Sequence, residues 1–146
     1  MKIQAIFCLL ALIISCEISA ANDDITVSDA WVREAPPGAA MLAAYMTITN
    51  TGNRTRVLEW VESMNFSPVM LHRSAVVNGM ATMLHQDSLS IPAHGKIELK
   101  PGSFHLMMPA PSIPMRAGNA AYFILHFRNG DCLMIETSVK KASDMP

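Results

Sequence analysis

The chain has 146 residues, and 11 Lys and Arg residues nearly balance 12 Asp and Glu residues, so the formal net charge is -1. This length suits one domain, and the charge balance argues against both a basic nucleic-acid-binding face and an acidic, disordered tail. Hydrophobic residues make up 51% of the chain, which is ample material for a core, and the 12 Met residues direct attention to thioether chemistry.

The first 21 residues have the pattern of a secretory signal peptide. Lys2 supplies a positive charge, the stretch Ile3–Ile14 is almost entirely apolar, and small residues follow as far as Ala21. The apolar run is too short for a permanent anchor, and no later stretch is long enough to span a bilayer. The sequence therefore predicts a removed segment, 1–21, and a mature domain, 22–146, that works in the periplasm.

A second interpretation of this segment stays open. The tetrapeptide Ile13-Ile14-Ser15-Cys16 resembles a bacterial lipobox, in which the Cys is lipidated and becomes the first residue of the mature chain. The domain would then carry an N-terminal lipid anchor. Simple cleavage after Ala20 or Ala21 instead removes Cys8 and Cys16, and it leaves Cys132, which we expect to be a small core residue.

The rest of the chain predicts an all-β fold. Apolar and polar residues alternate over short runs bounded by Gly, Pro, Asn and Ser, and no stretch has sustained helical periodicity. The dipeptides Asn78-Gly79 and Asn129-Gly130 are typical of hairpin turns. Such spacing favours an antiparallel β-sandwich or a small Greek-key barrel. The expected strands are 25–33, 41–50, 54–62, 69–77, 80–86, 88–91, 96–99, 104–107, 120–127 and 132–139.

The tripeptide His105-Leu106-Met107 has the residue types of a soft-metal site. Residues i and i+2 of a strand project to the same face, so His105 and Met107 project together and Leu106 points to the core. His72 and Met83 lie on the two runs that flank the Asn78-Gly79 turn, and a hairpin brings such residues together. A single His or Met on a strand is usually a packing or surface residue, so the argument depends on all four.

The donor types select the metal. Thioethers are soft and suit Cu(I), which imidazole also binds, whereas zinc sites prefer Cys, His and carboxylate, and calcium and magnesium prefer oxygen. Four neutral ligands leave the site with the charge of the ion, which favours a monovalent cation. Outside the cytoplasm a Cys pair would be lost to a disulfide, which a thioether cannot form.

The order and spacing of the four residues, His72-x10-Met83-x21-His105-x-Met107, match the signature of the periplasmic copper chaperones called PCu(A)C, His-x10-Met-x21-His-x-Met. The chain resembles this family over residues 25–139. The segments that also look like the family are Asp29–Gly38, Tyr45–Asn50, Ile91–Gly95 and Leu99–Met107.

The resemblance implies a cupredoxin-like β-sandwich that binds one Cu(I) near its surface through His72, Met83, His105 and Met107. It further implies delivery of the copper to the Cu(A) centre of cytochrome c oxidase, alone or alongside Sco-type thiol proteins. The expected role is thus oxidase assembly and copper homeostasis, without catalysis. We expect a monomer with no nucleic-acid partner and no transmembrane segment.

Some positions depart from the family. Met70 stands where the family often has Glu, and Met108 begins a different run after the last ligand. On an ideal strand we expect both side chains to alternate away from the neighbouring ligands, and a bulge would set them beside those ligands. The tail 140–146 lacks a His- and Met-rich extension, so Cu(II) storage is not expected. His85, His94 and His126 lie outside the signature and are expected to be surface or packing residues.

Two other classes of protein remain as alternatives. A blue-copper electron carrier needs a Cys thiolate with two His and an axial Met, but no His follows Cys132 in the chain. A structural, adhesin-like β-sandwich would bind no copper. An enzyme is not expected, because the chain has no nucleophile elbow, HExxH or CxxC motif.

Overall fold

The computed structural model describes residues 24–144, so the expected signal peptide and the Cys16 lipobox lie outside the described residues. This part of the chain forms ten strands and a short 3-10 helix, Ala142–Asp144. None of its helices is long and apolar enough to cross a membrane. The strands are β1 (Ile25–Arg33), β2 (Met41–Asn50), β3 (Arg56–Ser63), β4 (Met70–Val77), β5 (Met80–His85), β6 (Leu89–Ile91), β7 (Gly95–Leu99), β8 (Phe104–Pro109), β9 (Ala120–Phe127) and β10 (Cys132–Lys140).

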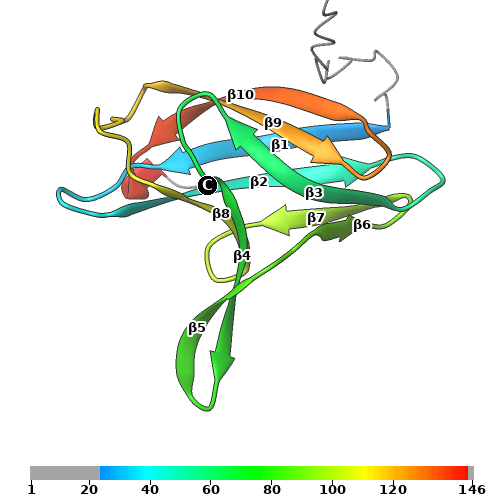
Figure 1. The fold of residues 1–146 in the computed structure, drawn as a ribbon, viewed down its shortest axis with the longest axis horizontal. Coiled ribbons are helices and arrows are strands. Elements are labelled where there is room, and N and C mark those ends of the chain that lie inside the picture. The colour runs from blue at the N-terminus through cyan, green and yellow to red at the C-terminus, as the bar shows by residue number, and fades with distance from the viewer. Residues whose placement is uncertain (1–23, 145–146) are drawn as a thin grey trace, which may run out of the picture.

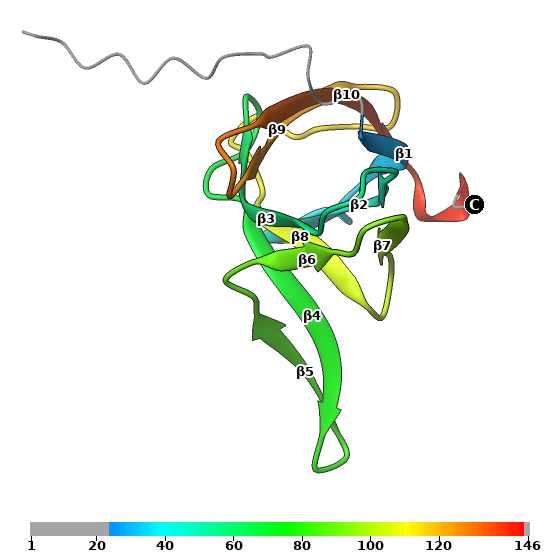
Figure 2. The same cartoon turned by 90° about the vertical axis from the view of Figure 1, so that its right-hand side faces the viewer.

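The strands form one continuous sheet in the order β5-β4-β8-β7-β2-β1-β10-β9-β3-β6, with an additional β8–β2 pairing. The sheet curls around a core, as the end-on view in Figure 2 shows. The all-β, cupredoxin-like prediction is confirmed. The sheet is not purely antiparallel, however, because β1 pairs with β10 and β7 pairs with β8 in parallel.

Strict alternation explains why the inner face is apolar. Along β9 every second residue is buried, so Phe123, Leu125 and Phe127 point inward, whereas Tyr122 and Ile124 are only partly buried. Leu106 and Met108 of β8 are fully buried in the same core. The core is therefore built from the inward positions of strands that lie far apart in sequence.

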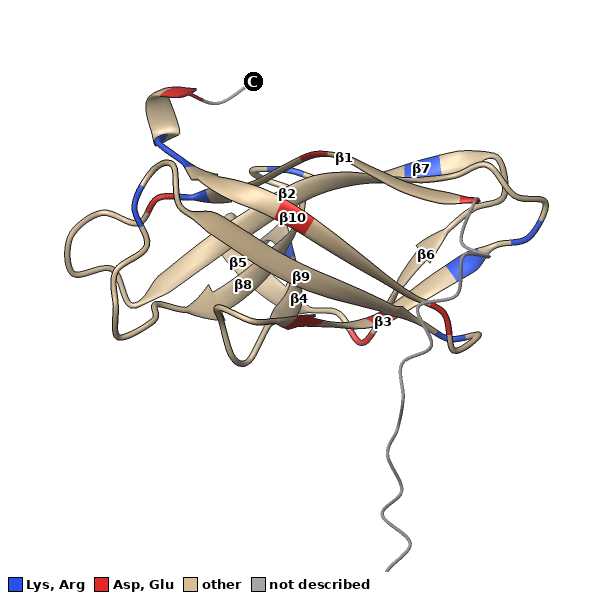
Figure 3. Cartoon of the chain, turned by 90° about the horizontal axis from the view of Figure 1, so that it is seen from above, with Lys and Arg blue, Asp and Glu red and all other residues tan. Residues whose placement is uncertain are grey.

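The β4–β5 hairpin extends away from the curled part of the sheet, as Figures 1 and 2 both show. Its turn is Asn78-Gly79, with φ of 50° and 78°, the left-handed values that a tight hairpin turn requires. Residues 74–86 contain no Asp, Glu, Lys or Arg. In Figure 3 the charged residues of both signs are interspersed over the other strands and loops. Five large apolar side chains of the hairpin are exposed: Val76, Val77, Met80, Met83 and Leu84.

Cys132 opens β10 and is buried, as expected for a core residue. The β10–β9 register places it opposite His126, on the far side of β1 from the β4–β8 pair. The only Cys of the described residues is therefore remote from the predicted copper ligands.

Candidate metal centre

The four predicted ligands lie on three neighbouring strands, with His72 in the middle. The β4–β8 register sets His72 opposite His105 and Met70 opposite Met107, so Met107 is diagonal to His72. The β4–β5 register sets His72 opposite His85, which makes Met83 diagonal to His72 on the other side. Opposite and diagonal residues of one sheet face are within reach of long side chains. The fold therefore gathers the other three predicted residues around His72.

His105 has a fixed orientation and a buried nitrogen with no partner. It is only 4% exposed, and its Nδ1 lies 3.1 Å from the carbonyl oxygen of Ser103. Because a carbonyl only accepts hydrogen bonds, the ring must carry its proton on Nδ1 to make this contact. The lone pair of Nε2 then remains, and Nε2 is buried without a hydrogen-bond partner. This arrangement prepares Nε2 for a metal ion.

His72 lies against His105 with the two rings stacked, their centroids 6.0 Å apart. Its Nδ1 is also buried without a hydrogen-bond partner. Burial lowers the pKa of His72, and the nearby rings of His105 and His85 lower it further, whereas the backbone of Met70 acts in the opposite direction. A lowered pKa keeps the imidazole neutral at mildly acidic pH, which is the form that binds a metal.

The two thioethers differ in exposure. Met107 is half-buried between β4 and β2, where it pairs with Met70 and Ala43. Met83 is 56% exposed on β5. Both side chains line one open recess of about 270 Å³, which Met41 and Tyr45 of β2 also line. The site is therefore closed on the His105 side and open on the Met83 side.

Met70 and Met108 lie in different environments. Met108 is fully buried in the core, as the alternation of β8 predicts. The prediction that Met70 points away from its neighbouring ligand is wrong. Met70 precedes His72 by two residues on β4 and pairs with Met107, so all three share a face. The i, i+2 spacing of Met70 and His72 in the sequence already implies that these two side chains share a face of the strand.

The three remaining histidines divide into one near the site and two away from it. His85 lies opposite His72, and the two rings meet edge to face with centroids 5.5 Å apart, so His85 adjoins a predicted ligand although its sequence position lies outside the signature. His94 is exposed, in the loop between β6 and β7. His126 stacks on Trp60 at 4.6 Å and contacts Glu62, so it is a packing residue on β9.

The donor set near His72 consists of imidazoles and thioethers. Within residues 24–144, no three His, Cys, Asp or Glu side chains converge where they could hold an ion. An arrangement of that kind would favour zinc or a hard cation. Here the side chains diagonal to His72 are the thioethers of Met83 and Met107, which favour soft Cu(I).

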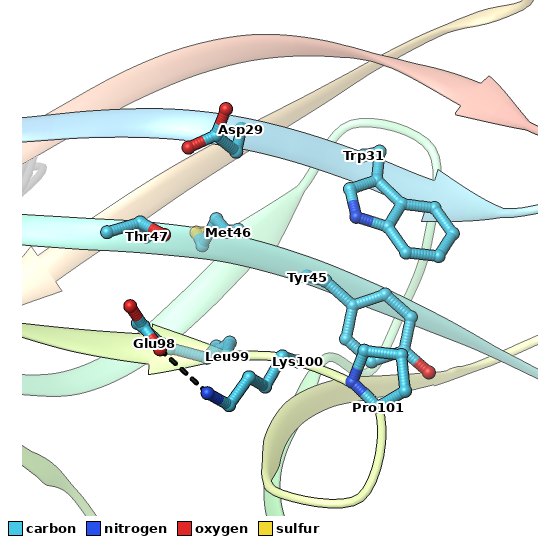
Figure 4. Close-up of a pocket in the computed structure, with 9 residues that line it drawn as sticks. All are labelled: Asp29, Trp31, Tyr45, Met46, Thr47, Glu98, Leu99, Lys100 and Pro101. Carbon is cyan, nitrogen blue, oxygen red and sulfur yellow. Dashed lines mark hydrogen bonds and ion pairs between the residues drawn. The ribbon is translucent and has the colours of Figure 1, made fainter. Parts of the chain in front are cut away.

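A second recess, of about 400 Å³, adjoins the site beyond Tyr45 (Figure 4). Trp31 and Tyr45 form one wall, with ring centroids 4.7 Å apart. Glu98 on its rim accepts hydrogen bonds from Lys100 and Lys96, which lower its pKa to about 2. Glu98 is thus engaged by two lysines, and the recess contributes an aromatic wall rather than metal ligands.

A family model described as "Putative lipoprotein LpqE-like" matches residues 25–139. The chain is 34% identical over 122 residues to "Putative lipoprotein Lxx21020" of Leifsonia xyli subsp. xyli, covering 83% of this chain and 72% of that protein. It is 27% identical over 105 residues to "Uncharacterized protein RP573" of Rickettsia prowazekii, covering 71% of this chain and 57% of that protein.

Solved structures have the same architecture. The Cu(I) form of DR1885 from Deinococcus radiodurans is 30% identical with a TM-score of 0.64, covering 77% of this chain and 76% of that one. The copper-bound PCuAC domain from PmoF2 is 23% identical with a TM-score of 0.67, covering 81% and 93% of the two chains, which shows a shared fold. The chain therefore belongs to the LpqE-like family, and its β-sandwich is of the PCuAC type.

Proposed function

We propose that this protein is an exported copper chaperone that binds one Cu(I) ion through His72, Met83, His105 and Met107. The observation that carries the proposal is the pairing of His72 with His105 on β4 and β8. Each of these rings has a buried nitrogen without a hydrogen-bond partner. Buried polar atoms without partners are rare and costly, so a site for an ion explains both. The copper-bound forms of DR1885 and of the PmoF2 domain support copper as that ion.

The arrangement suits transfer better than storage or catalysis. His105 is enclosed, whereas Met83 is exposed on the β4–β5 hairpin. An acceptor can therefore displace the ligands one at a time, beginning at Met83. As the physiological acceptor we propose the Cu(A) subunit of cytochrome c oxidase, reached directly or with a Sco-type thiol protein. The names of the relatives as lipoproteins support export, and the periplasm is the compartment we propose.

The geometry does not favour a blue-copper electron carrier. That centre needs a thiolate beside two imidazoles. Cys132 is buried and lies on β10, away from His72 and His105. A purely structural sandwich would leave the unpartnered nitrogens of these two rings without explanation.

Competition for Cu(I) against a chromophoric chelator tests the proposal on the exported, purified protein. We expect one Cu(I) per chain, and we expect Met83→Leu to weaken binding by about tenfold, because it replaces a thioether ligand with an inert side chain of similar size. Met80→Leu is the matched control, since Met80 is also exposed (69%, against 56% for Met83) on the same strand but lies closer to the turn.

Equal affinities for wild type, Met83→Leu and Met80→Leu would remove Met83 from the site. No binding by the wild type would overturn the copper function altogether. Delivery is tested by mixing the loaded protein with the apo soluble domain of the Cu(A) subunit. Copper should then appear on that domain, and copper that stays on the loaded protein would contradict the proposed acceptor.

A further inference from the structure

We propose that His85 is a further copper-binding residue, onto which the ion moves from His105 on its way out of the site. This inference rests on the proposed function and goes beyond its four ligands. His85 ends β5, directly opposite His72, and His105 lies opposite His72 on the other side. The three imidazoles therefore form a row across β5, β4 and β8, with His72 shared by two neighbours.

The spacing of the row fits two positions for an ion. The His72 ring centroid is 5.5 Å from that of His85 and 6.0 Å from that of His105. Two imidazoles that share one tetrahedral ion, with metal–nitrogen bonds of about 2 Å, have centroids about 5 Å apart. Small ring movements thus allow His72 to share an ion with either neighbour. No three of the described His, Cys, Asp or Glu side chains surround one point, which fits two positions better than a single three-histidine site.

Each position also has its own thioether. Met107 follows His105 by two residues on β8, and Met83 precedes His85 by two residues on β5, so each Met shares a face with its His. The inner position would hold copper with His72, His105 and Met107, together with Met83, the fourth of the proposed ligands. The outer position would hold it with His72, His85 and Met83. Both combine imidazole with thioether, as Cu(I) prefers.

The exposure of the two positions gives the transfer a direction. His105 is 4% exposed, whereas the side chain of His85 is 59% exposed and Met83 is 56% exposed. In the step that we propose, the bonds from copper to His105 and Met107 break as a bond to His85 forms. His72 and Met83 keep their bonds, and copper remains Cu(I) throughout, so no electron or proton is required. The ion then lies where an acceptor can reach it.

His85 has little structural role in the apo fold. Apart from the His72 ring, its side chain has a 3.7 Å contact with the carboxylate of Asp87, whose side chain is fully exposed. Such exposed contacts contribute little to stability. Replacement of His85 should therefore change copper handling without unfolding the protein.

Stopped-flow release of Cu(I) from the loaded protein to excess bicinchoninate tests this inference. We expect His85→Ala to slow release by about tenfold, because the exposed ligand that receives the ion is lost. The equilibrium affinity should change by less than about threefold, since the inner position keeps its ligands. The control is His94→Ala, which removes an exposed His on the loop between β6 and β7 and should release copper at the wild-type rate.

Two results would overturn the inference while leaving the copper function intact. One is release from His85→Ala at the wild-type rate. The other is an affinity loss in His85→Ala as large as that of His105→Ala, which would make His85 an ordinary ligand of one site. Circular dichroism of the apo variants checks that each remains folded. Failure of the wild type to bind Cu(I) would instead overturn the proposed function, and this inference with it.

Discussion

His105→Ala is expected to lower the affinity of the protein for Cu(I) by about a hundredfold or more, because groups that only orient a metal ligand already contribute tenfold to a hundredfold. His105 is the most enclosed of the proposed ligands, and its contact with the Ser103 carbonyl directs the lone pair of Nε2 into the site. Alanine removes this nitrogen and supplies no substitute. Competition with a chromophoric Cu(I) chelator measures the change.

His105→Asn serves as a second variant, since it keeps a polar side chain on β8 and limits the cavity left by the ring. Thermal unfolding of both apo variants should show that they remain folded at the temperature of the titration. An affinity within about threefold of the wild type in either folded variant would exclude His105 as a copper ligand.

Met108→Ala is expected to lower the free energy of unfolding by about 3 kcal/mol, within the usual range for truncation of a buried Met. Met108 is fully buried between the strands, and its neighbour Met107 faces the other way. Its loss creates a cavity in the core but removes no donor atom from the copper site. Urea unfolding of the apo protein, followed by tryptophan fluorescence, measures the change.

The copper affinity of Met108→Ala should stay within about threefold of the wild-type value under conditions where the variant is folded. Loss of copper binding with little loss of stability would mean that Met108, rather than Met107, faces the ion. The two variants, His105→Ala and Met108→Ala, thus distinguish the copper-binding face of β8 from the face that packs in the core.

Most of the strands and the hairpins could be predicted because the information is local. Alternation along β9 and β2 and the dipeptides Asn78-Gly79 and Asn129-Gly130 depend only on neighbours in sequence. The fact that His105 and Met107 share a face could also be predicted, because a strand has a period of two. The proximity of His72 to Met83 across a hairpin follows from the position of the turn.

Strand irregularities could not be predicted in this way. A regular strand over 54–62 would place Leu58 and Trp60 on one face. In the structure the register shifts between these residues, so Leu58 is buried with Val61 and Trp60 is exposed. A bulge adds one residue to one strand and inverts the pattern beyond it. A similar shift separates Ser28 from Trp31 on β1, where Asp29 has a φ of 52°.

The pairing register of strands that are distant in sequence could not be predicted either. That β4 pairs with β8, so that His72 meets His105, depends on the packing of the whole sheet. The parallel pairings of β1 with β10 and β7 with β8 also depend on it. The position of His85 beside His72 follows from the hairpin register, but its importance emerges only when β8 is in place on the other side of His72.

Copper K-edge X-ray absorption on the Cu(I)-loaded protein tests the ligand set most directly, because it reports the types of atoms bound to the ion. The account predicts both nitrogen and sulfur scatterers, and it predicts that the sulfur contribution falls in Met83→Leu and in Met107→Leu but not in Met80→Leu. A spectrum with nitrogen and oxygen scatterers alone would contradict the imidazole–thioether site. So would a sulfur contribution unchanged by the Met83 and Met107 substitutions.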